Sequence, residues 1–276
     1  MKREFAVILS VYRKDQAAFV KRALESIWQL QTVRPAQIVL MIDGPVGEDI
    51  LAVIDAFEAQ CPVLKVVQLP QNVGLGNAMR IAMEETEYEI IARMDSDDIS
   101  ASDRFAQQLR FFEENAAVDV VGGDISEFVG EEDHIVAYRR VPEGNEAIKR
   151  YLKKRCPLNH VTVMFKKSAV LKAGGYIEQF WNEDYYLWIR MAQSGAVMAN
   201  TGTVLVNVRT GKDMYSRRGG KKYFQSELFL QNYMLKRKMI SLPTYIDNVA
   251  KRWIMQRVLP NRIRGWVFRT LARKGK

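Results

Sequence analysis

The first third of the chain alternates short apolar runs with amphipathic stretches. Four runs rich in Val and Ile stand before residue 95, at positions 5–11, 37–42, 64–69 and 89–94, and each is followed by a polar turn. Between the first two runs, residues 16–30 place apolar side chains every three or four positions, which is the spacing of one helix face. This alternation predicts βαβ units and a mostly parallel sheet.

The pattern changes after residue 115. The apolar runs become shorter, at 118–122, 135–141 and 161–165, and predict a mixed half with some antiparallel strands. A second predicted helix, 104–114, joins the two halves. The sequence therefore predicts an α/β fold.

Size and charge define the organisation further. With 276 residues, of which 48% are apolar, the chain can bury a full core. The net charge of +9 is concentrated near the end, where residues 236–276 carry twelve Lys and Arg against the single acid Asp247. We expect one domain over residues 1–210, divided near residue 115, and a helical basic extension over 211–276.

The composition also excludes some classes of protein. No window approaches the roughly 18 apolar residues that cross a bilayer. Cys61 and Cys156 are too few for a disulfide framework, so we expect the protein in a reducing cytosol. The segment 72–77 lacks the third glycine of a dinucleotide fingerprint, where Met79 stands, and the chain has no phosphate loop of the G-x-x-x-x-G-K-[ST] type.

Ligands of parallel sheets bind beyond the carboxyl ends of the strands, so the acidic run Asp95-Ser96-Asp97-Asp98 stands where a site is expected. One or two carboxylates together with substrate phosphates commonly hold Mg²⁺ or Mn²⁺. Spacing alone is weak evidence, because 14 Asp residues give about 0.7 Asp-x-Asp matches by chance. The alternative is a cluster of caps for the helix 104–114, to which Asp98 would belong.

Several motifs in order resemble the family-2 glycosyltransferases of GT-A fold. The similarity covers about residues 4–210, which makes it far more specific than one motif. It is carried by 6–12, Asp43-Gly44, 72–78, 93–98, 167–176 and 182–188. The resemblance implies a Rossmann-like GT-A fold, with residues 1–115 as the nucleotide-binding half and 116–210 as the acceptor half.

The resemblance also implies residue roles in nucleotide binding. Ser10, Tyr12 and Asp43 would hold the nucleoside. A carboxylate can accept the imide N–H of uracil, which favours UDP. The alternative for Asp43 is an ordinary turn, since Asp-Gly-Pro is typical of turns.

The phosphates and the metal complete the implied donor site. The segment with Asn72, Gly74 and Asn77 could hold phosphate on backbone N–H groups, or only shape its turn. Asp97 would bind Mn²⁺ or Mg²⁺ directly. Asp95 would contact ribose or share the metal, and Asp98 would support one of these roles.

Glu183 and Asp184 open a predicted helix and are the candidate catalytic pair. An acceptor hydroxyl must lose its proton as it attacks the anomeric carbon, and a positioned base contributes about 10²–10⁴-fold. Following the family pattern, Asp184 is the predicted base for a direct, inverting displacement. The alternative is a pair of first-turn acids that interact with the helix dipole.

Two residues are candidates for acceptor contact. Trp181 could stack on a sugar face, as could Tyr185 and Tyr186, although two of these three aromatics are more typical of a core or a pocket wall. His160 could meet phosphate or acceptor, or it could be an ordinary loop histidine.

The end of the chain contains a basic amphipathic pattern. From Ile263, the residues Trp266, Val267, Thr270 and Leu271 follow a helical stripe with arginines beside it. Such a helix is expected to bind an anionic membrane surface. The alternatives are a helix packed on the domain, and nucleic acid, which we do not expect as a partner.

Together with these patterns, the resemblance implies an inverting, metal-dependent transferase that moves a sugar from a nucleotide-sugar to a glycan or lipid-linked acceptor in bacterial surface polysaccharide synthesis. We expect it to be cytoplasmic and peripheral on the inner face of the cell membrane. Two alternatives remain. A sugar-nucleotide nucleotidyltransferase usually has a Gly-rich loop after its first strand, which 10–14 lacks. A non-catalytic membrane-binding protein would use the acidic run only structurally.

Overall fold

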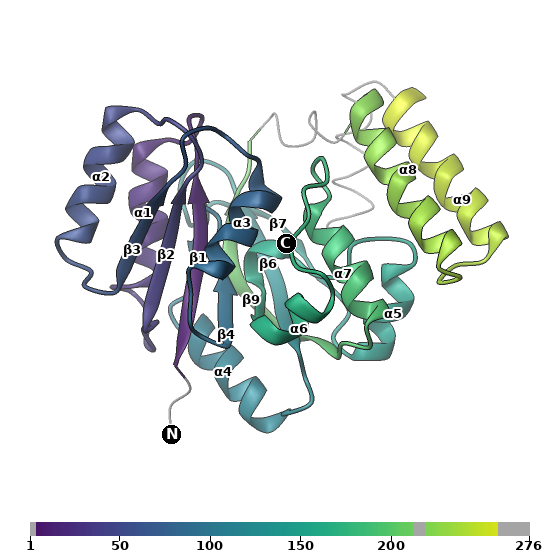
Figure 1. Cartoon of the computed structure of the whole chain (residues 1–276), viewed down its shortest axis with the longest axis horizontal. Coiled ribbons are helices and arrows are strands. Elements are labelled where there is room, and N and C mark those ends of the chain that lie inside the picture. The colour runs from purple at the N-terminus through teal and green to yellow at the C-terminus, as the bar shows by residue number, and fades with distance from the viewer. Residues whose placement is uncertain (1–3, 212–218, 259–276) are drawn as a thin grey trace.

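The computed structural model describes residues 4–211 and 219–258. Within these residues one nine-stranded sheet has the strand order β3-β2-β1-β4-β8-β6-β9-β5, and β7 pairs with β6. Helices cover both faces of the sheet, and two further helices stand at one side of it (Figure 1). The α/β fold predicted from the sequence is confirmed.

The first half of the sheet is parallel, as expected. Strand β1 pairs with β2 and β4, and β2 pairs with β3, all in parallel. The elements of this half are β1 (Phe5–Val11), α1 (Ala17–Ile27), β2 (Gln37–Ile42), α2 (Glu48–Glu58), β3 (Leu64–Gln68), α3 (Leu75–Glu84) and β4 (Ile90–Arg93).

Alternate residues of these strands enter two cores. Val7 and Leu9 of β1 belong to the cluster that α1 and α2 cover, whereas Ile8 belongs to the cluster that α3 covers. Strands buried on both faces are continuous apolar runs, which is why the sequence pattern located them. The carboxyl ends of β1, β2 and β4 consequently meet at one edge of the sheet.

The second half of the sheet is mixed. Strand β8 is antiparallel to β4 and β6, β7 is antiparallel to β6, β5 is antiparallel to β9, and β9 is parallel to β6. The elements are β5 (Ile99–Ser100), α4 (Arg104–Glu114), β6 (Val120–Phe128), β7 (Ile135–Arg139), α5 (Asn145–Leu152), a 3₁₀ turn η1 (His160–Thr162), β8 (Met164–Lys166), α6 (Lys167–Lys172), α7 (Glu183–Gln193) and β9 (Met198–Arg209).

Three expected boundaries were wrong. The first helix covers 17–27 and not 16–30, because the backbone leaves helical geometry at Trp28. The run 161–165 begins as a 3₁₀ turn, in which the Thr162 hydroxyl donates to the carbonyl of Asn159 at 2.8 Å and competes with strand pairing. The run 118–122 extends to Phe128, since β9 pairs with this strand beyond its two glycines.

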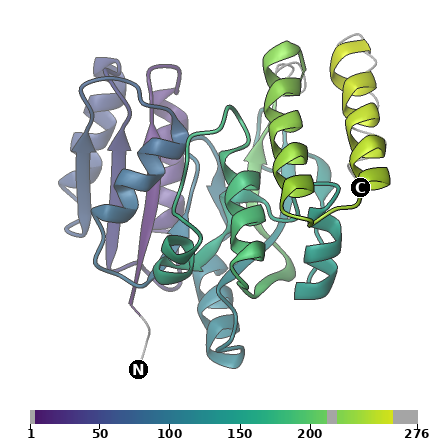
Figure 2. The ribbon, with the colours of Figure 1, turned by 45° about the vertical axis from the view of Figure 1, so that its right-hand side comes forward.

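Two helices and a π-helical turn are the last elements of the described residues. These are α8 (Lys221–Lys236), α9 (Leu242–Trp253) and η3 (Ile254–Val258), and Figure 2 shows α8 and α9 side by side. Leu230 and Met234 of α8 share a core cluster with Tyr185 and Trp188 of α7, so α8 packs on the body. No described helix is long and apolar enough to cross a membrane. The amphipathic pattern from Ile263 lies outside the described residues.

Candidate active site

The acidic loop Asp95–Asp98 follows β4 directly, at the sheet edge that the sequence predicted. Asp95 forms an ion pair with Arg93, the last residue of β4, whose side chain is buried. Asp98 is also buried, and its Oδ1 accepts the backbone N–H of Arg209 at 2.8 Å. The alternative in which Asp98 caps α4 is therefore wrong: that helix begins after Asp103, which makes no side-chain cap.

Asp97 is the exposed member of the loop. Its carboxylate is nevertheless surrounded by protein atoms, and this desolvation raises its pKa to about 6, with the charges of Asp95 and Asp15 contributing. Burial, together with the charges of Asp97 and Asp95, also raises the pKa of Asp98. The charges of the neighbouring carboxylates thus oppose the ionisation of Asp97 and Asp98.

Asp15 is a neighbour of this loop that sequence reasoning missed. Its Oδ2 accepts the Ser96 hydroxyl at 2.8 Å and the Tyr12 backbone N–H at 3.0 Å. Burial raises its pKa, and the charge of Asp95 adds to that increase. Asp15 therefore joins the turn after β1 to the acidic loop. The only sequence signal was its place in the polar turn after the first strand.

Asp43 lies at the end of β2 and is largely enclosed by the loop 72–74. Its Oδ1 accepts the Val73 N–H at 2.7 Å, and its Oδ2 accepts from the Asn72 side chain at 2.8 Å and the Gly74 N–H at 3.2 Å. Asp43 and Asn72 thus join the loop after β2 to the loop after β3. A carboxylate has about four acceptor sites, so Asp43 retains capacity for one further donor.

Gly44 and Gly74 allow this close approach. Gly44 has a φ of +83°, and a Cβ there would lie 2.5 Å from the backbone nitrogen of Asn72. Gly74 has a φ of +89°, and a Cβ there would lie 2.7 Å from the carboxylate of Glu178. Both positions therefore require glycine.

The N-terminus of α3, predicted to hold phosphate, carries the Glu178 carboxylate. Glu178 Oε2 accepts the N–H of Gly76 at 2.9 Å and that of Asn77 at 3.4 Å. The Asn77 side chain donates to the carbonyl of Val73 at 3.0 Å and so stabilises its own turn. The Glu178 carboxylate thus occupies the helix N-terminus at which the sequence indicated phosphate binding. Glu178 stands in the loop before α7 and gave no sequence signal.

The two remaining nucleoside candidates lie at the end of β1. Ser10 is half-buried in register with Met41 of β2. Tyr12 follows the strand and lines a pocket of about 700 Å³.

Glu183 and Asp184 begin α7 and line the same pocket. Glu183 is buried, and burial together with the charge of Asp184 raises its pKa to about 8. Burial also raises the pKa of Asp184, but the Tyr185 N–H, which donates to Asp184 Oδ1 at 2.6 Å, and the charges of Arg139 and Arg93 favour its ionised form. The environments of the two acids therefore differ.

Arg93 connects the acidic loop with this pair electrostatically. Burial disfavours its charge, but the carboxylate of Asp95 holds its pKa above the ordinary value, and Glu183 contributes. Its positive charge favours ionisation of Asp97, Asp98 and Asp184. A charged residue at the end of an apolar strand is the signal that could have identified it.

The three aromatic candidates occupy different surroundings. Trp181 is 47% exposed, stacks on Phe180 at 5.0 Å between ring centroids, and lines the pocket. Tyr185 is buried and donates to the carbonyl of Leu152 at 2.6 Å. Tyr186 contacts the rings of Phe229 and Tyr233 of α8.

His160 is placed beside the core rather than in the pocket lining. Its Nε2 lies 2.9 Å from the Tyr176 hydroxyl, and its ring meets Trp188 edge-on. Burial, and then the charge of Arg93, holds its pKa well below the ordinary value, so it is neutral near pH 7.

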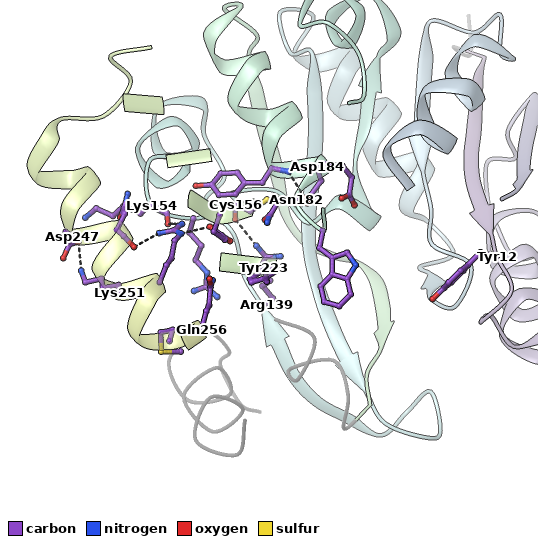
Figure 3. A pocket seen from close by; sticks show the side chains of 18 residues that line it. Tyr12, Arg139, Lys154, Cys156, Asn182, Asp184, Tyr223, Asp247, Lys251 and Gln256 are labelled. Carbon is purple, nitrogen blue, oxygen red and sulfur yellow. Dashed lines mark hydrogen bonds and ion pairs between the residues drawn. The ribbon is translucent and has the colours of Figure 1, made fainter. Parts of the chain in front are cut away.

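Figure 3 shows how the pocket is arranged around Asp184. Tyr12 lies at one end, and Lys154 and Lys251 lie at the other, with Asp184 between them. Over the described residues no group of three or more His, Cys, Asp and Glu is arranged to hold a metal ion. The exposed Asp97 with Asp95 still fits a cation that takes one or two carboxylates and completes its ligands with phosphate oxygens.

Comparison with known proteins identifies the family. The profile of the family described as "Glycosyl transferase family 2" matches residues 6–178. The chain belongs to glycosyl transferase family 2. This finding confirms the resemblance read from the motifs, and the matched residues include the acidic loop and the loop 72–77.

Curated glycosyltransferases match most of this chain. The chain is 38% identical to an uncharacterized glycosyltransferase of Haemophilus influenzae, over 98% of this chain and 100% of that protein. It is 33% identical to the UDP-Gal:alpha-D-GlcNAc-diphosphoundecaprenol beta-1,3-galactosyltransferase of Escherichia coli, over 98% and 97%. It is 37% identical to the amylovoran biosynthesis glycosyltransferase AmsE of Erwinia amylovora, over 84% and 85%.

Solved structures share the fold. S. aureus TarS 1-349 in complex with UDP-GlcNAc matches with a TM-score of 0.65 at 16% identity, over 97% of this chain and 76% of that one. The mannosyltransferase PcManGT from Pyrobaculum calidifontis in complex with GDP-Man and Mn²⁺ matches with a TM-score of 0.63 at 15% identity, over 96% and 72%. The predicted GT-A fold of this family-2 glycosyltransferase is confirmed.

Proposed function

We propose that this glycosyltransferase transfers a sugar from a UDP-sugar to a hydroxyl of a lipid-linked acceptor, with inversion at the anomeric carbon. The observation that supports it most is a single pocket that joins Tyr12 of the nucleoside end to Glu183 and Asp184. The Escherichia coli relative, named as a galactosyltransferase for UDP-Gal and a diphosphoundecaprenol-linked acceptor, supports these donor and acceptor classes.

In this proposal Asp97, assisted by Asp95, holds Mn²⁺ or Mg²⁺. The bound cation would neutralise negative charge on the departing diphosphate. The exposed position of Asp97 and the mutual repulsion of Asp95, Asp97 and Asp15 support this role, since a cation would relieve that repulsion. Asp98 keeps the loop in place through Arg209. The complex of PcManGT with Mn²⁺ agrees with a divalent ion.

Asp184 is the proposed base. Glu183, with a pKa of about 8, stays protonated near neutral pH, whereas Asp184 has two cations and a backbone N–H that favour its ionised form. Two neighbouring carboxyl groups with different environments divide into an acid and a base in this way. The ionised Asp184 would take the proton of the acceptor hydroxyl as that oxygen attacks the anomeric carbon.

We also propose a peripheral position on the inner face of the membrane, through the basic extension 211–276. Residues 236–276 carry twelve Lys and Arg and one acid. Within the described part of this extension, α9 exposes Leu242, Ile246 and Trp253, each by more than half. Apolar and cationic residues on one helical segment are typical of an interfacial anchor.

The deciding experiment for the donor site is calorimetric titration of UDP with and without Mn²⁺. We expect Mn²⁺ to raise UDP affinity at least tenfold in the native protein and to have no effect in Asp97→Asn. Asp103→Asn, an exposed aspartate before α4, is the matched control and should behave as the native protein. Equal Mn²⁺ dependence in Asp97→Asn and the native protein would refute the assignment.

A second assay tests the reaction itself. Incubation with a UDP-sugar and an acceptor glycoside should release UDP, and NMR of the product should show the anomeric configuration opposite to that of the donor. Retention of configuration would exclude direct displacement. Synthesis of UDP-sugar from UTP and a sugar phosphate would instead support the nucleotidyltransferase alternative.

A further inference from the structure

Basic side chains gather in the part of the pocket farthest from Tyr12. Lys154 and Arg155 follow α5, and Lys251 and Arg252 belong to α9. In Figure 3 Lys154 and Lys251 lie on the side of Asp184 opposite to Tyr12. The nucleoside candidates and this basic wall, defined as Lys154, Arg155, Lys251 and Arg252, therefore stand at different ends of one pocket.

Two of the four cations already have partners. Arg252 Nε lies 2.5 Å from a carboxylate oxygen of Glu227, and Lys251 Nζ lies 2.7 Å from one of Asp247. The side chains of Lys154 and Arg155, in contrast, form no ion pair or hydrogen bond with any residue in 4–211 or 219–258. Two uncompensated positive charges thus face the pocket.

The backbone that carries these two cations is held in place. The N–H groups of Lys154 and Arg155 both donate to the carbonyl of Tyr151 at 2.9 Å. From α9, Arg252 Nη2 donates to the carbonyl of Lys154, and the Asn248 side chain donates to that of Lys153, each at 2.8 Å. The turn is therefore organised before any ligand binds, which reduces the entropy lost on binding.

The position of the wall relative to Asp184 determines which substrate it can meet. In a direct displacement the acceptor oxygen approaches the anomeric carbon from the side opposite to the leaving diphosphate. With the donor nucleotide at the Tyr12 end, the donor diphosphate lies on that side of Asp184. The basic wall then lies on the acceptor side.

We propose that Lys154 and Arg155 bind the diphosphate of an acceptor in which the sugar is joined to a lipid through that group. This inference rests on the proposed function, because it assumes that Asp184 receives the acceptor hydroxyl. A diphosphate supplies two adjacent anionic groups, which match two adjacent cations. A free diphosphate has no apolar part, whereas α9, which contributes four residues to the same pocket, also exposes Leu242 and Ile246.

Direct binding tests the proposal without requiring transfer. Farnesyl diphosphate is titrated into the protein in saturating UDP and Mn²⁺, which occupy the donor site. We expect binding by the native protein and at least tenfold weaker binding by the double variant Lys154→Gln/Arg155→Gln. The matched control Arg150→Gln/Lys153→Gln removes the same charge from exposed residues at the same helix end and should bind as the native protein.

Two further probes separate the sources of affinity. Farnesol lacks the diphosphate, so its binding should be weak and equal in the native protein and both variants. Inorganic pyrophosphate lacks the chain, so it should bind more weakly than farnesyl diphosphate and lose affinity in Lys154→Gln/Arg155→Gln. Circular dichroism checks that both double variants fold.

Three results would overturn the proposal. Equal affinity for farnesyl diphosphate in both double variants would show that Lys154 and Arg155 do not bind the diphosphate. Binding of farnesyl diphosphate only when UDP and Mn²⁺ are left out would assign the anion to the donor site. If Lys154→Gln/Arg155→Gln lost farnesol binding to the same degree as farnesyl diphosphate binding, the substitutions would have damaged the pocket in general. The Mn²⁺-dependent titration of Asp97→Asn uses no acceptor, so failure at the basic wall is distinguishable from failure of the proposed function.

Discussion

The acidic loop 95–98 and the basic wall, which we propose form the donor and acceptor ends of the active site, differ in how their charges are balanced. In the acidic loop the charge of Asp95 opposes the ionisation of both Asp97 and Asp98, and only Asp95 has an ion-pair partner among the described residues. In the basic wall Glu227 and Asp247 neutralise two of four cations. One end therefore favours a bound cation, and the other favours a bound anion.

The two ends also differ in how the fold supports them. The acidic loop follows the buried strand β4. It is held by the ion pair between Arg93 and Asp95 and by the backbone N–H of Arg209, which donates to Asp98. In the basic wall, Lys154 and Arg155 follow the short helix α5, and hydrogen bonds from α9 hold their turn. The donor end thus depends on the sheet, whereas the acceptor end depends on the C-terminal helices. We infer that acceptor specificity can change with α9 while the donor end is preserved.

The largest expected effect comes from the residue between the two ends. Asp184→Asn keeps the shape of the side chain and removes the proton acceptor, so we expect kcat to fall by about 10²–10⁴-fold. UDP affinity should stay within twofold, because the nucleoside end is unchanged. Steady-state kinetics and calorimetry with UDP measure the two quantities separately.

Asp247→Asn is the control for this variant. Asp247 also lines the pocket, but it is paired with Lys251 on the exposed side of α9, so its loss should change kcat only slightly. Near-native turnover by Asp184→Asn would show that another residue is the base. A fall in UDP affinity would show that Asp184 takes part in donor binding.

The second effect tests how much the donor end depends on close backbone packing. Gly44→Ala places a Cβ 2.5 Å from the Asn72 nitrogen in a backbone with φ of +83°, so strain and a clash combine. Gly130→Ala has a similar φ of +73° but meets nothing within 4 Å, so only strain remains. We expect Gly130→Ala to cost about 1 kcal/mol of unfolding free energy, and Gly44→Ala about 2–3 kcal/mol.

Urea unfolding of both variants measures this difference. Gly44→Ala should also weaken UDP binding, because the loop 72–74 moves away from Asp43. Equal stability of the two variants would show that the strand ends are less tightly joined than the distances indicate.

The sequence located the polar strand ends better than it located the basic wall, for a physical reason. Strands buried on both faces must be apolar, and the polar residues that end them must meet at one sheet edge. The pattern therefore placed Asp43, Asn72 and Asp97 at that edge, while their proposed roles came from the resemblance. Contacts such as Asp15 with Ser96 and Glu178 with Gly76 join residues far apart in the chain. No local pattern encodes such pairs.

The basic wall was missed for a different reason. Lys154 and Arg155 belong to a run of cations after α5, and such a run is usually solvated. Their role depends on α9, which returns about a hundred residues later to close the pocket. The sequence indicated a basic extension but not where it packs.

The third effect sharpens the contrast between Glu183 and Asp184. Burial, with the charges of Asp184 and Glu178, raises the pKa of Glu183 to about 8, while Arg93 opposes the shift. The unfolded chain ionises this group near pH 4.5, so the folded state binds the extra proton between these values. Stability should therefore be highest below pH 4.5 for this group and decrease as pH rises toward 8.

Calorimetric melting of the native protein and Glu183→Gln measures this contribution. Between pH 5 and 8 the Tm of the native protein should fall relative to that of Glu183→Gln by several degrees. The exposed Glu113→Gln should follow the native curve. Parallel curves for the native protein and Glu183→Gln would mean that Glu183 is ionised in the folded state.

The smallest expected effect concerns the surface of α9. Ile246 is 57% exposed, so Ile246→Ser should leave the fold and soluble donor binding unchanged. If this helix meets the membrane, the loss of an apolar contact should weaken sedimentation with anionic vesicles by roughly three- to tenfold. Leu30→Ser is the matched control, because Leu30 is also exposed but follows α1, across the molecule from α9 (Figure 1). Equal sedimentation of the two variants would favour a membrane contact that does not involve α9, and would separate the anchor from the acceptor end of the pocket.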